Sequence, residues 1–356
     1  MRIGIYGTGV VAQLVWDIAK EYDVSVVFFI QTIPERNIFR SIPVVAPYEI
    51  DFGSIDYLVL GSDVYRQEMS EELKKCVLNY DRNQSKIIDY DNFVDLVKGD
   101  IDYKIVRVDK GISYIYTKYD TVIGPYMNKT HRNWAGDMID ELVDFAFDNT
   151  DFKASGFFFD IGANIGTTSI YVKKCWPELN VIAFEPGKKN YDLFRANCIL
   201  NGVEDCHIVN MGLGSQPSDG FLFYRSYNPG GSMVVSKKSE IATEHVTIGV
   251  LDDYMTKNTI DPREVSFIWM DTEGFEADII VGAKELLSKR KVPLVHEFDP
   301  QIYKDRGVSE EYLNIMKSTY THFFDVNDKE NGQFKIKSVD ELEKMMNGNK
   351  TDLFFF

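Results

Sequence analysis

The sequence has few cysteines and few histidines. Its 356 residues include four cysteines and five histidines. The cysteines, Cys76, Cys175, Cys198 and Cys206, form no Cys-x-x-Cys pair and have no histidine at a spacing typical of zinc ligands. We therefore expect free thiols, buried or incidental, and no structural zinc.

Positive charge is also scarce. Lys and Arg total 39 against 55 Asp and Glu, which gives a net charge of −16 at pH 7. Because nonspecific binding to a phosphate backbone depends on clustered positive charge, nucleic acid is disfavoured as a partner. No apolar run approaches the ~20 residues that span a bilayer, and the first residues predict a strand instead of a signal peptide. We expect a cytoplasmic protein without a membrane span, of undetermined oligomeric state.

The length and composition indicate two globular α/β domains. Hydrophobic residues make up 44% of the chain and aromatic residues 13%, enough for well-filled cores. The 356 residues exceed the roughly 100–200 of one ordinary domain. A polar, helical pattern from residue 90 precedes a predicted hairpin at 104–117. We place the boundary near residue 98, with domains at 1–98 and 99–356.

A glycine turn follows the first predicted strand, at residues 2–6. Gly7-Thr-Gly9-Val-Val-Ala12 then leads into a helical pattern, as in a dinucleotide-type turn. The second strand ends on Gln31, where an NAD-binding unit would have Asp or Glu, so NAD is disfavoured. Gly7 and Gly9 could face a nucleotide or could only permit tight strand-helix packing. The first 90 residues resemble the Rossmann-like domains of bacterial sugar-modifying enzymes, such as sialic-acid and bacillosamine acyltransferases, which implies a nucleotide-sugar or substrate-holding role.

A richer glycine turn lies in the second domain. The run Phe157-Phe-Phe159 predicts a buried strand, and Asp160-Ile-Gly-Ala-Asn-Ile-Gly166 predicts the turn into a helix. The next strand ends on Glu185, about 20 residues later, the spacing that brings a carboxylate to a ribose. The pattern is typical of a class I S-adenosylmethionine site. Gly162, Asn164 and Gly166 form the turn that admits the methionine part, Asp160 can hold the amino group or a bridging water, and Glu185 can accept both ribose hydroxyls.

Several blocks in a fixed order resemble the FkbM family of methyltransferases. They are Asp160-Ile-Gly-Ala-Asn-Ile-Gly166, Phe184-Glu-Pro186, Asn210, Leu251-Asp-Asp253, Met270-Asp-Thr-Glu-Gly-Phe-Glu276, Gly282-Ala283 and His296-Glu297. The resemblance covers residues of about 100–340 and implies a class I fold, a seven-stranded, mostly parallel sheet with helices on both faces. It adds Asn210 to the cofactor-binding residues. Gly212-Leu-Gly-Ser215 departs from the family's Ala-Leu-x-Asp, so no acidic contact near the adenine is carried over.

Four polar residues at predicted strand ends are candidates for catalysis. Methylation of a hydroxyl requires alignment of the oxygen with the methyl carbon and removal of the hydroxyl proton. We predict Asp271 or His296 as general base, with Glu273 and Glu297 orienting the acceptor. Asp271 could instead cap a helix, and His296 could be a hydrogen-bonded structural residue. Asp271, Glu273 and Glu297 could hold a divalent metal, but no ligand spacing demands one, and none is favoured.

The family implies transfer of methyl groups to hydroxyls, often of sugars or polyketide-derived compounds. We predict a bacterial O-methyltransferase that acts on a sugar or glycan-type acceptor, for example in polysaccharide biosynthesis, or on a secondary metabolite, with the acceptor in free or nucleotide-linked form. Trp134, Tyr224, Tyr227 and Trp269 could stack on a sugar ring, although core packing suits Trp269 better. The alternative is a nucleotide-sugar sensor or scaffold with a vestigial methyltransferase domain.

Overall fold

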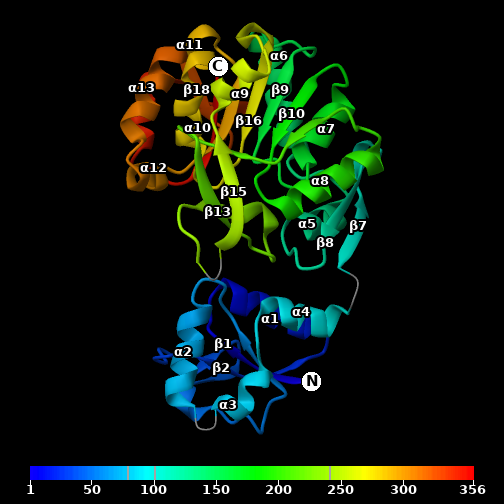
Figure 1. Ribbon diagram of the computed structural model, residues 1–356, viewed down its shortest axis with the longest axis vertical. Coiled ribbons are helices and arrows are strands. Elements are labelled where there is room, and N and C mark those ends of the chain that lie inside the picture. Colours follow the sequence, from blue (N-terminus) through cyan, green and yellow to red (C-terminus); the bar gives the residue numbers. More distant parts are fainter. Residues whose placement is uncertain (78–79, 100–101, 240–241) are drawn as a thin grey trace. The chain divides into compact units, whose positions relative to one another are not determined.

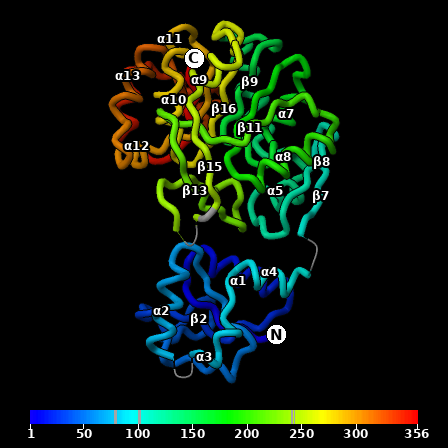
Figure 2. Tube along the Cα trace, in the orientation of Figure 1, coloured from blue at the N-terminus to red at the C-terminus, as the bar shows by residue number. Residues whose placement is uncertain are grey.

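The computed structural model describes residues 1–77, 80–99, 102–239 and 242–356 (Figure 1). These residues form two compact units. The first comprises Met1–Lys104 with Thr117–Thr121, and the second Ile105–Tyr116 with Val122–Phe356. The amino terminus belongs to the first unit and the carboxyl terminus to the second (Figure 2). The predicted boundary at residue 98 coincides with the end of helix α4 (Tyr90–Lys98), and residue 100, where the FkbM-like part was expected to begin, lies outside the described residues.

The first unit is an α/β sheet of order β3-β4-β2-β1-β5-β6. Parallel pairing joins β4, β2, β1, β5 and β6, and β3 is antiparallel to β4. Helix α1 buries apolar residues at helical spacing, including Val11, Val15 and Ile18, and it contacts β1 and β2. The elements are β1 (Arg2–Tyr6), α1 (Val10–Glu21), β2 (Ser25–Ile30), β3 (Ile38–Phe39), β4 (Ile42–Val45), β5 (Tyr57–Leu60), α2 (Arg66–Cys76), α3 (Tyr80–Asn83), β6 (Ile87–Ile88) and α4.

The second unit contains a mixed sheet of order β11-β10-β9-β16-β17-β22-β18-β21. The first five strands are parallel, and β22, β18 and β21 pair antiparallel. The strands are β9 (Phe157–Ile161), β10 (Asn180–Phe184), β11 (His207–Val209), β16 (Val265–Met270), β17 (Leu294–Phe298), β18 (His322–Asp325), β21 (Lys337–Ser338) and β22 (Thr351–Phe355). Within the described residues the sheet thus has eight strands instead of the seven predicted, because the two-residue strand β21 extends one edge.

Helices cover both faces of this sheet. Successive residues of a strand point to opposite faces, so Phe158 packs in one apolar cluster with α5–α8 and Phe159 in another with α9–α14. Burial on both faces explains the uninterrupted apolar run of β9. The helices are α5 (Ile123–Thr130), α6 (Gly136–Asn149), α7 (Thr167–Cys175), α8 (Lys188–Asn201), α9 (Leu251–Lys257), α10 (Glu276–Gly282), α11 (Lys284–Lys289), α12 (Pro300–Arg306), α13 (Ser309–Thr319) and α14 (Leu342–Met345).

A smaller sheet of order β12-β15-β13-β14 is inserted between β11 and β16. Its strands are β12 (Gly212–Leu213), β13 (Ser218–Phe223), β14 (Met233–Val235) and β15 (Ala242–Gly249). Two further pairs are β7 (Tyr103–Arg107) with β8 (Ser113–Thr117) and β19 (Lys329–Glu330) with β20 (Gln333–Phe334). None of the helices in the described part of the chain is long and apolar enough to span a membrane. All four cysteines are free thiols, as predicted.

Candidate active site

The site lies at the carboxyl ends of the parallel strands. Chain order along the sheet reverses between β9 and β16, and ligands of open α/β sheets bind at such a switch point. The turn after β9 passes against the end of β16, where the Asp271 N–H donates to the Ile161 carbonyl oxygen at 2.9 Å. Gly162 has a φ of +89°, and a Cβ there would lie 1.8 Å from the Asp271 carbonyl oxygen. The turn therefore requires glycine at this position.

Gly166 and Asn164 complete the glycine turn. Gly166 has a φ of +88°, and a Cβ there would lie 2.1 Å from the Phe194 ring. Asn164 adopts the left-handed conformation with a φ of 51°. Its Oδ1 atom is buried and has no hydrogen-bond partner within the described residues. Asn164 lines both cavities described below, although its Oδ1 atom itself is buried.

Asp160 faces the protein interior. Its side chain is 1% exposed, and its Oδ2 accepts a hydrogen bond from the Ser169 hydroxyl at 2.5 Å. Burial raises the pKa of Asp160 to about 7, although the hydrogen bonds from Ser169 lower it. Asp160 lines neither cavity. This geometry argues against a direct contact of Asp160 with the amino group, because the carboxylate bonds the first turn of α7. The alternative of a contact through a bridging water stays a prediction.

Glu185 follows β10 and faces the first cavity. Its two carboxylate oxygens accept hydrogen bonds from the N–H groups of Asn164 and Gly187, each at 2.8 Å. Burial raises the pKa of Glu185 to about 7, while these hydrogen bonds lower it. Each carboxylate oxygen has a second lone pair, so each can still accept a hydrogen bond from a ribose hydroxyl.

Asn210 has a different position from the one predicted. Its side chain is exposed, and its Nδ2 donates to the carbonyl oxygens of Glu185 and Pro186, both at 2.9 Å. It lines neither cavity. Its predicted role in cofactor binding is corrected to an indirect one, because its contacts fix the backbone that carries Glu185.

The first cavity contains about 600 Å³ of empty space, part of it open to solvent. One wall is the glycine turn with Glu185, and much of the opposite wall comes from the inserted sheet and from Phe275. Local sequence patterns do not identify these apolar residues, because their position depends on how the inserted sheet folds. They are Leu213, Leu222, Val234 and Ile248. An apolar wall opposite a carboxylate suits the flat base and polar sugar of a nucleoside.

The second cavity adjoins the first and contains about 1430 Å³ of empty space, also open to solvent. Trp134 lines it, as does Trp269, which is also packed in the core, as the sequence favoured. Tyr126 lines it too and was not predicted. The Tyr126 and Trp134 rings meet edge to face with centroids 5.2 Å apart. The two cavities share Gly162, Asn164, Gly230, Asp271 and Glu273.

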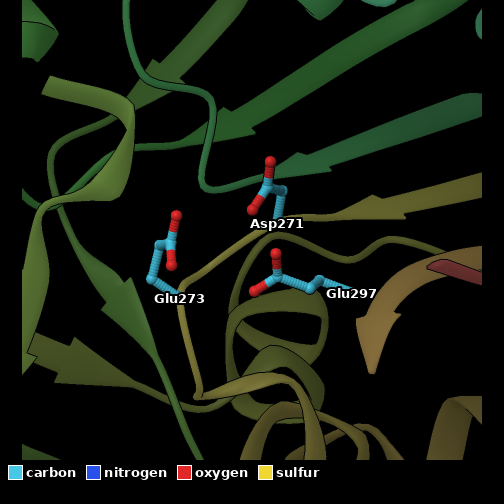
Figure 3. Close-up of side chains that lie close together, drawn as sticks. All are labelled: Asp271, Glu273 and Glu297. Atoms are coloured by element: carbon cyan, nitrogen blue, oxygen red, sulfur yellow. The ribbon is translucent and has the colours of Figure 1, made fainter. Parts of the chain in front are cut away.

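Three carboxylates, which we call the acidic cluster, lie on the wall of the second cavity: Asp271, Glu273 and Glu297 (Figure 3). Strand register brings them together, because β16 and β17 pair Met270 with His296 and so place the next residues side by side. One oxygen of each carboxylate lies within 4.8 Å of the others. Such a group could hold a divalent cation. Lys350 also reaches it, with Nζ 2.7 Å from the Glu297 Oε1 atom and 3.3 Å from the Glu273 Oε2 atom.

The acidic cluster has unusual electrostatics. The Asp271 side chain is exposed at the cavity surface. Desolvation of its carboxylate by the surrounding protein, followed by the charges of Glu297 and Glu273, holds the pKa of Asp271 well above its usual range. Burial likewise raises the pKa of Glu297 to about 7, and the hydrogen bond from Lys350 opposes that shift. A raised pKa makes a carboxylate a stronger proton acceptor once it is ionised, which suits proton transfer.

His296 is not placed to act as a general base. Although it adjoins the second cavity, its ring is fully buried and stacks on Phe355, with centroids 5.5 Å apart. Its Nδ1 lies 2.7 Å from the Glu297 carbonyl oxygen and its Nε2 lies 3.0 Å from the Tyr312 hydroxyl. Burial lowers the pKa of His296 to about 4, so the ring is neutral at pH 7. The predicted catalytic role is corrected to the structural alternative, because both ring nitrogens already have partners.

Glu276, a first-turn carboxylate of α10, holds the loop that carries Glu273. Its side chain is fully buried, and its oxygens accept hydrogen bonds from the Thr272 N–H and hydroxyl, both at 2.7 Å, and from the Gly274 N–H at 3.1 Å. Glu273 itself has a φ of 55°, a conformation that non-glycine residues rarely adopt. The loop is therefore fixed by its hydrogen bonds to the Glu276 carboxylate.

Comparison with known proteins gives a family match for the part of the chain that carries most of this site. Residues 160–333 match the methyltransferase FkbM domain. This part of the chain is a methyltransferase domain. The match begins at Asp160, the last residue but one of β9, and takes in the glycine turn, Glu185 and the acidic cluster. Lys350 lies beyond the matched residues.

The methyltransferase domain also has curated relatives. Methyltransferase 1 of Beauveria bassiana is 27% identical over 159 residues, which cover 40% of this chain and 64% of that protein. The 2-O-methyltransferase NoeI of Sinorhizobium fredii is 23% identical over 174 residues, 45% of this chain and 70% of that protein. The chain thus spans less than two thirds of the length of Methyltransferase 1. A solved structure of methyltransferase FkbM from Methylobacillus flagellatus aligns with a TM-score of 0.39 and 13% identity, covering 100% of this chain and 90% of that one.

Proposed function

We propose that the chain is an S-adenosylmethionine-dependent O-methyltransferase that acts on a hydroxyl of a sugar or glycan-type acceptor. The observation that carries the proposal is the position of Asp271 on the wall shared by two adjoining cavities. A cofactor in the first cavity and an acceptor in the second would meet beside this carboxylate. An enzyme for methyl transfer needs this juxtaposition.

The residues of the first cavity fit S-adenosylmethionine. Glu185 offers a carboxylate to the ribose hydroxyls. The unpartnered Oδ1 of Asn164 offers an acceptor to the α-ammonium group, and the glycine turn leaves space for the methionine part. When bound, S-adenosylmethionine supplies an electrophilic methyl group.

The residues of the second cavity would prepare the acceptor. Asp271 accepts the proton of the acceptor hydroxyl as the oxygen attacks, and Glu273 and Glu297 accept hydrogen bonds from neighbouring hydroxyls. Its raised pKa makes Asp271 a stronger base than an ordinary carboxylate once it is ionised. The loop at Pro229–Gly231 lies at both cavities and helps to exclude water from the reacting atoms.

Two observations support a carbohydrate-like acceptor. Tyr126 and Trp134 give the second cavity an aromatic wall, on which the C–H face of a sugar ring can pack. The relative NoeI is named a 2-O-methyltransferase. The bacterial, cytoplasmic setting in polysaccharide biosynthesis remains a proposal, as do the domain limits 1–98 and 99–356 and a nucleotide-sugar-binding role for Gly7 and Gly9.

Isothermal titration of the full chain with S-adenosylhomocysteine tests the cofactor assignment. We expect one site per chain, and an absence of heat at millimolar ligand would refute the proposal. A methyl-transfer assay over a panel of sugars and glycans then tests the acceptor class. Binding of nucleotide-sugar without any methyl transfer would favour the sensor or scaffold alternative.

Cofactor affinity should depend on the ionisation of Glu185. Because the pKa of Glu185 is raised to about 7 in the free protein, the carboxyl is protonated below that pH and accepts ribose hydroxyl protons less well. The affinity for S-adenosylhomocysteine should therefore rise as the pH increases through 7, with a limiting slope of about tenfold per pH unit below the pKa. Isothermal titration between about pH 5.5 and 8.5 measures this dependence.

Glu185→Gln should remove most of this pH dependence and weaken binding at high pH. Glu178→Gln, at an exposed carboxylate outside both cavities, is the matched control and should behave like wild type. The buried Asp160 also has a pKa of about 7, and the Glu185→Gln variant distinguishes the pH effect of Glu185 from that of Asp160. An affinity that is constant over this pH range in the wild-type protein would contradict the role of Glu185.

A further inference from the structure

Lys350 occupies a fixed place beside the acidic cluster. It directly precedes β22, which pairs antiparallel with β17 in a register that places Asp352 opposite Glu297. Its Nζ atom lies 2.7 Å from Oε1 of Glu297 and 3.3 Å from Oε2 of Glu273. The register of two central strands thus brings the ammonium group to the cluster.

A cation beside the acidic cluster would stabilise its ionised carboxylates. Three carboxylates whose ligand atoms lie within 4.8 Å of one another repel each other when ionised. The ring nitrogens of His296 contact the Glu297 carbonyl oxygen and the Tyr312 hydroxyl and not the carboxylates of the cluster. In the described part of the chain, Lys350 is the cation that contacts the cluster. Its ammonium group pairs with two of the three carboxylates, Glu273 and Glu297.

We propose that the Lys350 ammonium takes the place of a divalent cation in the acidic cluster. It neutralises and orients Glu273 and Glu297, and it leaves Asp271 outside the ion pairs of the described residues. An ammonium group has three donors and can serve two carboxylates at once. For catalysis this implies methyl transfer without a metal ion, with Lys350 as a positioning residue. This consequence rests on the proposed function.

Titration of the full-length chain with Mn²⁺, followed by electron paramagnetic resonance, tests the proposal. The wild-type protein should bind no stoichiometric Mn²⁺ up to ~1 mM, a weak limit for oxygen-ligand sites. Lys350→Met leaves three carboxylates without a cation and should gain one site, at least ~10-fold tighter than any binding by wild type. Lys350→Arg keeps the charge and should behave like wild type.

Two controls locate the effect. Lys344→Met removes an exposed lysine that pairs with Glu341 and should bind no more Mn²⁺ than wild type. Adding Glu297→Gln to Lys350→Met should abolish the gained site. Equal binding by wild type and Lys350→Met would overturn the proposal. So would a stoichiometric site in the wild-type protein that Glu297→Gln removes, a result that stands even if Lys350→Met fails to fold.

These outcomes are independent of turnover, because the titration needs neither cofactor nor acceptor. A silent methyl-transfer assay together with the expected Mn²⁺ results would refute the proposed function alone. If the enzyme is active, turnover should survive EDTA. Lys350→Met should lower kcat and leave the affinity for S-adenosylhomocysteine unchanged, and Lys350→Arg should restore most of kcat.

Discussion

Replacing Asp271 with asparagine is expected to lower kcat by about 10²–10⁴-fold, the usual contribution of a general base. Asparagine has nearly the same shape but cannot accept the proton of the acceptor hydroxyl at neutral pH. The affinity for S-adenosylhomocysteine should stay within about twofold of wild type, because the cofactor contacts come from Glu185 and the glycine turn. Methyl-transfer kinetics and isothermal titration on the same preparation separate the two effects.

The pH profile should give independent evidence for Asp271. Neighbouring carboxylates and burial hold its pKa well above the usual range, so wild-type kcat should rise with pH as Asp271 loses its proton. Asp271→Asn should remove that limb. Asp253→Asn, at an exposed carboxylate outside both cavities, is the matched control and should leave kcat unchanged. If Asp271→Asn retains wild-type turnover, Asp271 is not the base.

Gly162→Ala is expected to abolish cofactor binding in the range that titration can measure. The added Cβ would lie 1.8 Å from the Asp271 carbonyl oxygen, which belongs to the backbone and cannot rotate away. The positive φ of the residue adds strain of about 1–3 kcal/mol. Relief of the clash must separate the glycine turn from the end of β16, the contact that joins the two cavities. We expect a loss of affinity for S-adenosylhomocysteine of at least ~100-fold, or about 3 kcal/mol.

A second glycine distinguishes the clash from the backbone strain. Gly307, after α12, also has a positive φ, of +71°, but a Cβ there would meet nothing within 4 Å. Gly307→Ala should therefore cost about 1 kcal/mol of stability and leave cofactor affinity unchanged. Thermal unfolding accompanies both titrations. Cofactor binding by Gly162→Ala at wild-type affinity would contradict the close approach of the glycine turn to Asp271.

The sequence pattern predicted the positions of the residues around the acidic cluster only in part. Asp271 and His296-Glu297 were correctly assigned to the ends of neighbouring strands. Adjacent residues in a strand point to opposite faces, so the His296 and Glu297 side chains extend to opposite sides of the sheet, although both residues line the second cavity. The alternation of side chains along a strand predicts that His296 and Glu297 lie on opposite faces of the sheet. It does not predict which face each residue takes, because that depends on which helices cover each face. The structure places the His296 ring among Tyr312 and Phe355 and leaves Glu297 at the cavity.

For some residues of the site, no local sequence pattern predicts their role. Lys350 is one lysine among many in an unremarkable polar segment, and it reaches the cluster only because β22 pairs with β17. The apolar wall formed by Leu222 and Ile248 depends likewise on the folding of the inserted sheet over the glycine turn. Asn210 matched a motif yet turned out to hold the backbone, since a motif records a residue type and not what its side chain contacts.

The sequence by itself determined the α/β class, the buried β9 strand, the two glycines with positive φ and the carboxylates at the strand ends, because each depends on local spacing or on the conformations that a residue can adopt. Only the tertiary structure decided that Asp271 lies between two cavities, that His296 is buried and that Lys350 joins the acidic cluster. These facts depend on strand pairing between distant segments, and no local pattern encodes the register or the face of such a pairing.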